Sequence, residues 1–114
     1  MTSDEVKTRD IFCGKPIYSK TIRTNMQINA GQSNETSHGC LDVENIWVDL
    51  SNSFLKATNG LVFPISIAYY GSGFDNISPY VNANNIYFSS QGTWNTGWLK
   101  VITVRYTKTT DTAI

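Results

Sequence analysis

Side chains that alternate in polarity with a period of two constrain the fold of this chain more than any other feature of its sequence. In residues 61–70, one face carries the large apolar groups Leu61, Phe63, Ile65, Ile67 and Tyr69. The other face is lighter and includes Pro64 and Ser66. This alternation is typical of a β-strand with one buried face. Because Pro64 has no N–H to donate, we expect this strand at a sheet edge or locally bulged.

Turn-forming residues predict how the neighbouring strands connect. The pair Asn59 and Gly60 favours a two-residue hairpin turn with positive φ angles. This turn would join the strand just described to a partner strand at 53–58. A further strand is expected at 43–50, and a polar turn over 49–52 would separate it from the partner strand.

The longest strand is expected near the end of the chain, at residues 98–106. One of its faces carries Trp98, Ile102, Val104 and Tyr106, and the other carries Leu99 and Val101. Apolar groups on both faces favour a central strand, or one that is covered by a neighbouring subunit.

Two weaker strand patterns complete the predicted fold. They lie at 17–28 and 86–90, and loops rich in Gly and Asn lie at 29–39, 71–85 and 91–97. Short strands at this spacing predict an all-β chain that folds as a single antiparallel β-sandwich or jelly-roll-like domain. We expect this domain at 13–114, after an extended N-terminal arm at 1–12.

The charge balance narrows the choice of partners. Nine Lys and Arg residues balance nine Asp and Glu residues, so the formal net charge is zero. This removes the simplest electrostatic basis for binding nucleic acid or an anionic membrane. No apolar run approaches the ~20 residues of a membrane span, and we do not expect the acidic, polar residues at 1–5 to form a signal peptide. The 11 Asn, 11 Ser and 13 Thr residues favour a neutral polar ligand instead.

Residues that carry catalytic or metal chemistry are few. His38 is the one histidine and lies one Gly away from Cys40, a spacing that rarely allows a Cys–His nucleophilic pair. We therefore expect His38 to be a solvated histidine in a turn. One His and two distant Cys residues, which we expect as reduced thiols, cannot supply four zinc ligands. Asp42, Glu44 and Asp49 are expected on a solvated face, the alternative being a glycosidase pair of carboxylates. We therefore expect no enzyme activity, no metal and no cofactor.

Aromatic and amide side chains in the loops favour recognition. In the loop at 91–97, Trp94 stands beside Thr93 and Asn95, and such a group suits a neutral sugar, with its CH groups over the ring and its hydroxyls paired at the edge. The alternative is that Trp94 packs down as a lid on the core. A second set of candidate contacts comprises Tyr70, Phe74, Asn76 and Tyr80.

The two ends of the chain resemble a known module. Residues 2–6, followed by Cys-Gly-Lys-Pro-Ile-Tyr-Ser-Lys-Thr-Ile at 13–22, resemble the opening of a module of bacteriophage and prophage tail or fibre proteins. The ending Thr-Val-Arg-Tyr-Thr-Lys-Thr-Thr-Asp at 103–111 resembles the final strand and tail of that module, and residues 79–82 and 85–87 also fit its pattern.

Two departures from the module's pattern lie near its opening. Ile11 stands where the module usually has Trp, and Cys13 replaces the Asp before Gly14. Losing the Asp-Gly pair weakens the expected turn at this point, while the strand from Pro16 onward remains expected.

The resemblance implies a virion protein, made in the host cytoplasm, with a β-sandwich-like domain that is commonly trimeric. We hypothesise a non-enzymatic tail-fibre or receptor-binding tip domain, a homotrimer that adheres to a bacterial surface glycan. Its arm at 1–12 would contact other virion proteins. The alternative is a capsid decoration or fibre-capping protein with no affinity for a receptor.

Overall fold

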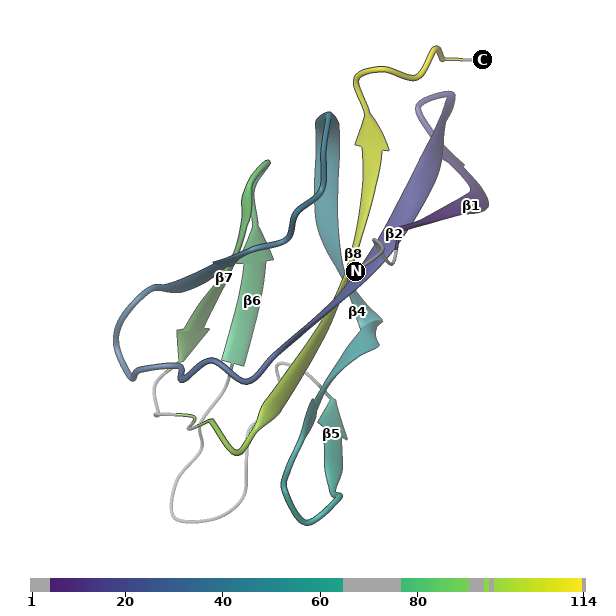
Figure 1. Ribbon diagram of the computed structural model, residues 1–114. Helices are drawn as coiled ribbons and strands as arrows, with labels where there is room; N and C mark the ends of the chain where they lie inside the picture. Colours follow the sequence, from purple (N-terminus) through teal and green to yellow (C-terminus); the bar gives the residue numbers. More distant parts are fainter. Residues whose placement is uncertain (1–4, 65–76, 91–93, 95, 114) are drawn as a thin grey trace.

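The computed structural model describes residues 5–64, 77–90, 94 and 96–113 of the chain. Within these ranges there are eight strands and no helix: β1 (Val6–Phe12), β2 (Lys15–Thr24), β3 (Asn34–Ser37), β4 (Val43–Lys56), β5 (Val62–Pro64), β6 (Ile77–Val81), β7 (Asn85–Ser90) and β8 (Leu99–Lys108). They form two antiparallel sheets that lie beside each other in a sandwich-like arrangement (Figure 1). The prediction of an all-β, antiparallel chain is confirmed.

The larger sheet has five strands in the order β1-β2-β8-β4-β5. β8 lies at its centre, paired with β2 on one side and β4 on the other. Of the two alternatives predicted for this segment, a central strand or a strand covered by a neighbouring subunit, the structure shows the first. Val101, on the second apolar face of this strand, is only 2% exposed within the single chain. Its burial therefore does not depend on a neighbouring subunit.

The smaller sheet has three strands in the order β3-β7-β6. β3 and β6 lie inside the segments 29–39 and 71–85, so the prediction that these segments are loops throughout is wrong. The sequence of β3, Asn-Glu-Thr-Ser, has no apolar alternation to reveal it. Its register against β7 makes it a strand, because that pairing satisfies its backbone polar groups.

The core lies between the two sheets. The smaller sheet contributes Ile77, Ile86 and Phe88, and β8 contributes Ile102, Val104 and Tyr106, all fully buried. Leu55 of β4, Ile28 and Trp94 complete this cluster. Ile28 and Trp94 form an isolated bridge in which each backbone N–H donates to the other residue's carbonyl at 2.8 Å. The burial of apolar surface from both sheets is what holds them together.

β4 is a single long strand, so the prediction of a turn at 49–52 between two strands is wrong. The residues on both sides of this segment pair with β8, and the register shifts between Asp49 and Phe54. The Ser53 hydroxyl donates to the Asp49 carbonyl at 2.7 Å and accepts the Thr103 N–H at 3.0 Å. The polar residues thus form an irregularity within the strand, because side chains replace the missing ladder bonds.

The hairpin between β4 and β5 is confirmed, with a loop of three residues where the sequence predicted two. The Ala57 N–H donates to the Leu61 carbonyl at 2.9 Å, and the Gly60 N–H donates to the Ala57 carbonyl at 3.0 Å. Within the loop only Gly60 has a positive φ, +91°. This is the turn-plus-bulge loop that a glycine at the third position permits. Of the strand predicted at 61–70, residues 65–70 lie outside the described part of the chain.

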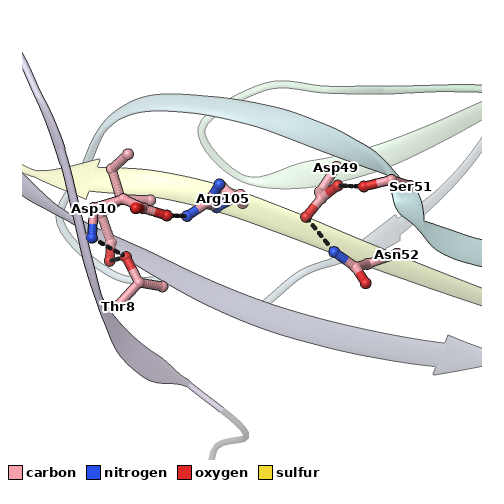
Figure 2. A network of polar contacts seen from close by, with 7 residues as sticks. Thr8, Asp10, Asp49, Ser51, Asn52 and Arg105 are labelled. Carbon is pink, nitrogen blue, oxygen red and sulfur yellow. Dashed lines mark hydrogen bonds and ion pairs between the residues drawn. The ribbon is translucent and has the colours of Figure 1, made fainter.

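Most of the predicted N-terminal arm forms the edge strand β1. It pairs with β2, with a register shift between Lys7 and Ile11. Thr8 and Asp10 lie at this irregularity: the Thr8 hydroxyl donates to the Ile17 carbonyl at 2.7 Å, and the Asp10 carboxylate pairs with Arg105 of β8 (Figure 2). Side-chain contacts therefore attach β1 where its ladder is interrupted.

Candidate functional site

The structure describes two of the candidate contact residues that the sequence indicated, Trp94 and Tyr80. The other candidates lie outside the described residues: Tyr70, Phe74, Asn76, Thr93 and Asn95.

Trp94 belongs to the core. Its side chain is only 5% exposed, and its indole N–H donates to the Ser90 hydroxyl at 2.9 Å. Its ring meets Trp98 edge-on, with centroids 4.8 Å apart. A ring buried in this way has no free face for a sugar, so we replace the expected ligand contact at Trp94 with the packing alternative.

Tyr80 faces outward from β6 and is 47% exposed. It lies directly opposite Tyr87 of β7, and the two rings stack with centroids 5.2 Å apart. This cross-strand pair holds the Tyr80 ring in one orientation. The Asn82 amide donates to the Tyr87 hydroxyl at 3.0 Å, which restrains the supporting ring in turn.

A groove of about 700 Å³ lies beside Tyr80 on the smaller sheet. Its lining comprises Gly31, Gln32, Ser33, Ser78, Tyr80, Ser89 and Ser90. Strand alternation explains why hydroxyls gather there: Ile77 and Phe88 point into the core, so their neighbours Ser78 and Ser89 point outward. These two serines lie opposite each other in the register of β6 and β7. We refer to this site as the serine groove.

The loop that forms one wall of the serine groove is held by the buried side chain of Asn34. Its amide N–H₂ donates to the carbonyls of Asn29 at 3.2 Å and Gln32 at 3.1 Å, and its amide oxygen accepts the Asn29 N–H at 3.1 Å. The Gly31 N–H donates to the Ser90 carbonyl at 2.9 Å, in a backbone conformation with a φ of +69°. Because these bonds form within the chain, the wall is in place before any ligand binds.

The chemistry of the serine groove is neutral and polar. Its lining carries hydroxyls, one side-chain amide, backbone groups and one aromatic ring. The Ser33 and Tyr80 hydroxyls, which both line the groove, lie within hydrogen-bond distance of each other at 3.4 Å. The nearby carboxylate of Glu35 accepts a bond from the Asn85 amide at 2.9 Å. Such a surface can pair with hydroxyl groups as donor and as acceptor while an apolar ring face covers CH groups.

Sequence reasoning found Tyr80 and missed the rest of the serine groove. Ser78 and Ser89 alternate with apolar neighbours, but that signal marks an outward face without indicating a site. The wall at residues 31–33 comes from a segment far away in the chain. Only strand pairing brings these parts together.

The acidic residues considered for catalysis are engaged separately. Glu44 pairs with Lys15 at 2.8 Å, while the Asp49 carboxylate accepts bonds from Ser51 and Asn52, each at 2.8 Å (Figure 2). The Asn52 bond is the main cause that lowers the pKa of Asp49 below its ordinary value. Asp42 and Glu44, the two carboxylates that lie two residues apart, are both exposed, as expected for a solvated face.

His38 is buried and hydrogen-bonded within the fold. The His38 side chain is 2% exposed, so the prediction of a solvated turn histidine is wrong. Its Nδ1 accepts the Cys40 N–H at 3.0 Å, which leaves Nε2 to donate to the Asn82 carbonyl at 2.9 Å. Nδ1 thus holds the loop of His38 itself, and Nε2 joins that loop to the turn after β6. Cys13 and Cys40 are free thiols.

The described residues contain no group of three or more His, Cys, Asp or Glu side chains arranged to hold a metal ion. They also contain no helix that is long and apolar enough to cross a membrane.

Comparison of the chain with protein-family models, curated proteins and solved structures found no significant match.

Proposed function

We propose that this chain is a non-enzymatic, carbohydrate-binding module of a phage virion that adheres to a bacterial surface glycan. The observation that carries the proposal is the serine groove, in which hydroxyls surround the outward ring of Tyr80. A neutral sugar presents hydroxyl edges and CH-rich faces, and the two features of the groove match these in kind.

The virion setting rests on the resemblance of the chain's two ends to a tail-fibre module. A groove that binds a neutral sugar through a few hydrogen bonds is expected to be weak by itself. A homotrimer would present three such grooves on one particle, and simultaneous attachment would raise the overall strength without any new contact.

A second candidate function is structural, as a capsid decoration or fibre-capping protein. The exposed apolar side chains of β1 favour it: Val6 is 59% exposed and Ile11 is 57% exposed on an edge strand. Edge strands with apolar side chains are suited to pairing with another chain. This role would place other virion proteins against β1, as predicted for the N-terminal arm, and would need no sugar in the serine groove.

Substitution of Tyr80 separates the two candidates. We expect Tyr80→Ala to weaken binding of the purified protein to host-cell envelopes by about tenfold or more, because it removes the ring that covers the sugar. Tyr80→Phe retains the ring and should lose much less. The measurement is retention of labelled protein on intact cells and on an array of bacterial surface polysaccharides.

Phe12 provides a matched control. It is 42% exposed and contacts one aromatic ring, that of Trp47, on the other sheet. Phe12→Ala removes a similar ring and should leave binding unchanged. Equal losses in Tyr80→Ala and Phe12→Ala, or no binding of the unaltered protein, would overturn the glycan proposal. The second of these results favours the structural role.

A further inference from the structure

A second cleft of about 610 Å³ lies between the β4–β5 hairpin loop and the turn before β8. Ala57, Thr58 and Asn59 line it on one side, and Thr96, Gly97 and Trp98 line it on the other. Thr58, Asn59 and Thr96 are exposed, whereas Trp98 is half-buried. We call this site the Trp98 cleft.

The Trp98 cleft combines the same kinds of group as the serine groove. Hydroxyls come from two threonines, an amide comes from Asn59 and an aromatic ring comes from Trp98. The lining carries no formal charge. Sequence reasoning expected an aromatic ring beside amides and hydroxyls at Trp94, and the structure presents that combination at Trp98.

Contacts within the chain hold both walls of the Trp98 cleft. The ring of Trp98 lies against Phe63, with centroids 5.8 Å apart, and against the edge of Trp94. The Asn25 amide donates to the Thr96 carbonyl at 3.0 Å. The opposite wall is the hydrogen-bonded three-residue loop that ends at Gly60. Because both walls are held without a ligand, little ordering is needed on binding.

Trp94 connects the two sites. Its indole N–H donates to Ser90, which lines the serine groove, and its ring contacts Trp98, which lines the second cleft. One buried side chain therefore separates their walls. The β4–β5 hairpin, the start of β6 and the end of β7 all lie toward the end of the molecule that is away from the C-terminus (Figure 1).

We propose that the Trp98 cleft is a second saccharide subsite and that the ligand is a chain of several neutral sugar residues occupying both sites. This inference rests on the proposed function of the serine groove. A single sugar ring fills one site only, whereas a longer chain gains contacts in the other. The binding strength should therefore increase with the length of the saccharide.

The experiment uses neutral bacterial surface polysaccharides as probes. A polysaccharide that binds the full chain on an array is cut into a series of defined lengths, and each length is titrated calorimetrically. We expect the association constant to rise by about tenfold or more from the shortest to the longest member. An association constant that does not change with length would overturn the second subsite and leave the serine groove intact. No binding on the array would overturn both proposals.

Variants test whether the increase in the association constant with saccharide length comes from the Trp98 cleft. Thr58→Tyr fills the Trp98 cleft from an exposed loop position, so it should remove the gain with length while short saccharides bind as before. Thr110→Tyr, at an exposed position beyond β8, is the matched control and should retain the gain. Persistence of the gain in Thr58→Tyr, with unchanged thermal unfolding, would contradict the proposal.

Discussion

Single residues in this protein are placed by their neighbours as much as by their own chemistry. In the sequence, Trp94 is flanked by the kind of polar residues that are common in binding loops. In the structure, its indole hydrogen bond and its contact with Trp98 place it in the core. Tyr80 points outward because side chains alternate along β6, and the ring of Tyr87 stacks against it. Whether an aromatic ring is exposed, and so able to contact a ligand, therefore depends on how it packs against its neighbours in the fold.

Lys100 is a residue whose burial has a measurable consequence. Its side chain is fully buried, and its ammonium group donates to the Met26 carbonyl at 2.6 Å. Burial disfavours the charged form and lowers the pKa of Lys100 to about 8 from 10.5. Between these values the unfolded chain holds a proton that the folded chain has released, so stability should rise with pH across this window.

The Lys100→Met variant isolates this effect, since tyrosines also titrate near the upper limit. We expect the free energy of unfolding of the unaltered protein, relative to Lys100→Met, to increase as the pH is raised from 8 to 10.5. Urea unfolding followed by tryptophan fluorescence measures it. A difference between the two proteins that stays constant with pH would contradict the lowered pKa.

At the scale of elements, an anchor next to β1 keeps this edge strand attached. The Glu5 carboxylate accepts bonds from the Tyr106 hydroxyl and from the Lys108 ammonium group, the latter at 2.9 Å. Burial alone would raise the pKa of Glu5, but the bonds from Tyr106 and Lys108 outweigh it and leave the pKa below its ordinary value. A carboxylate with a lowered pKa stabilises the fold above its unfolded pKa and loses this contribution as acid protonates it.

Glu5→Gln tests the anchor. We expect faster amide hydrogen exchange in β1 at neutral pH, equivalent to a local loss of about 1 kcal/mol, because the charged hydrogen bonds become weaker neutral ones. In the unaltered protein the same loosening should appear as the pH falls below the ordinary Glu value of 4.5. Glu35→Gln, on the smaller sheet, should leave β1 unchanged. Equal exchange rates of β1 in all three proteins would show that Glu5 does not anchor it.

At the scale of the whole molecule, apolar side chains are exposed at both edges of the larger sheet. The apolar residues Val6 and Ile11 at one edge of the larger sheet, and Leu61 and Val62 near the other, are each more than half exposed. Exposed apolar side chains at two edges favour contacts with further chains. The trimer proposal rests on these residues and on the resemblance to fibre modules.

Light scattering of the purified chain measures the assembly directly. We expect a particle of about 38 kDa, three times the 12.7 kDa of one chain, and dissociation by Ile11→Lys, which places a charge at the apolar edge. A particle of single-chain mass at micromolar concentration would contradict the trimer and would favour attachment to another virion protein.

The sequence predicted those features that depend on local pattern. Alternation at 98–106 predicted a central strand, and the Asn-Gly pair predicted the hairpin. Each of these follows from side-chain periodicity or turn chemistry, which act over a few residues.

Tertiary structure alone decided the rest. β4 continues through 49–52 because β8 offers partners to both of its halves. β3 is a strand because β7 lies beside it, and the serine groove exists because residues 31–33, Ser78 and Ser89 are brought together by that same sheet. Pairing between distant segments is selected by the hydrogen bonds and the buried apolar surface of the whole fold, and no local pattern of residues contains that information.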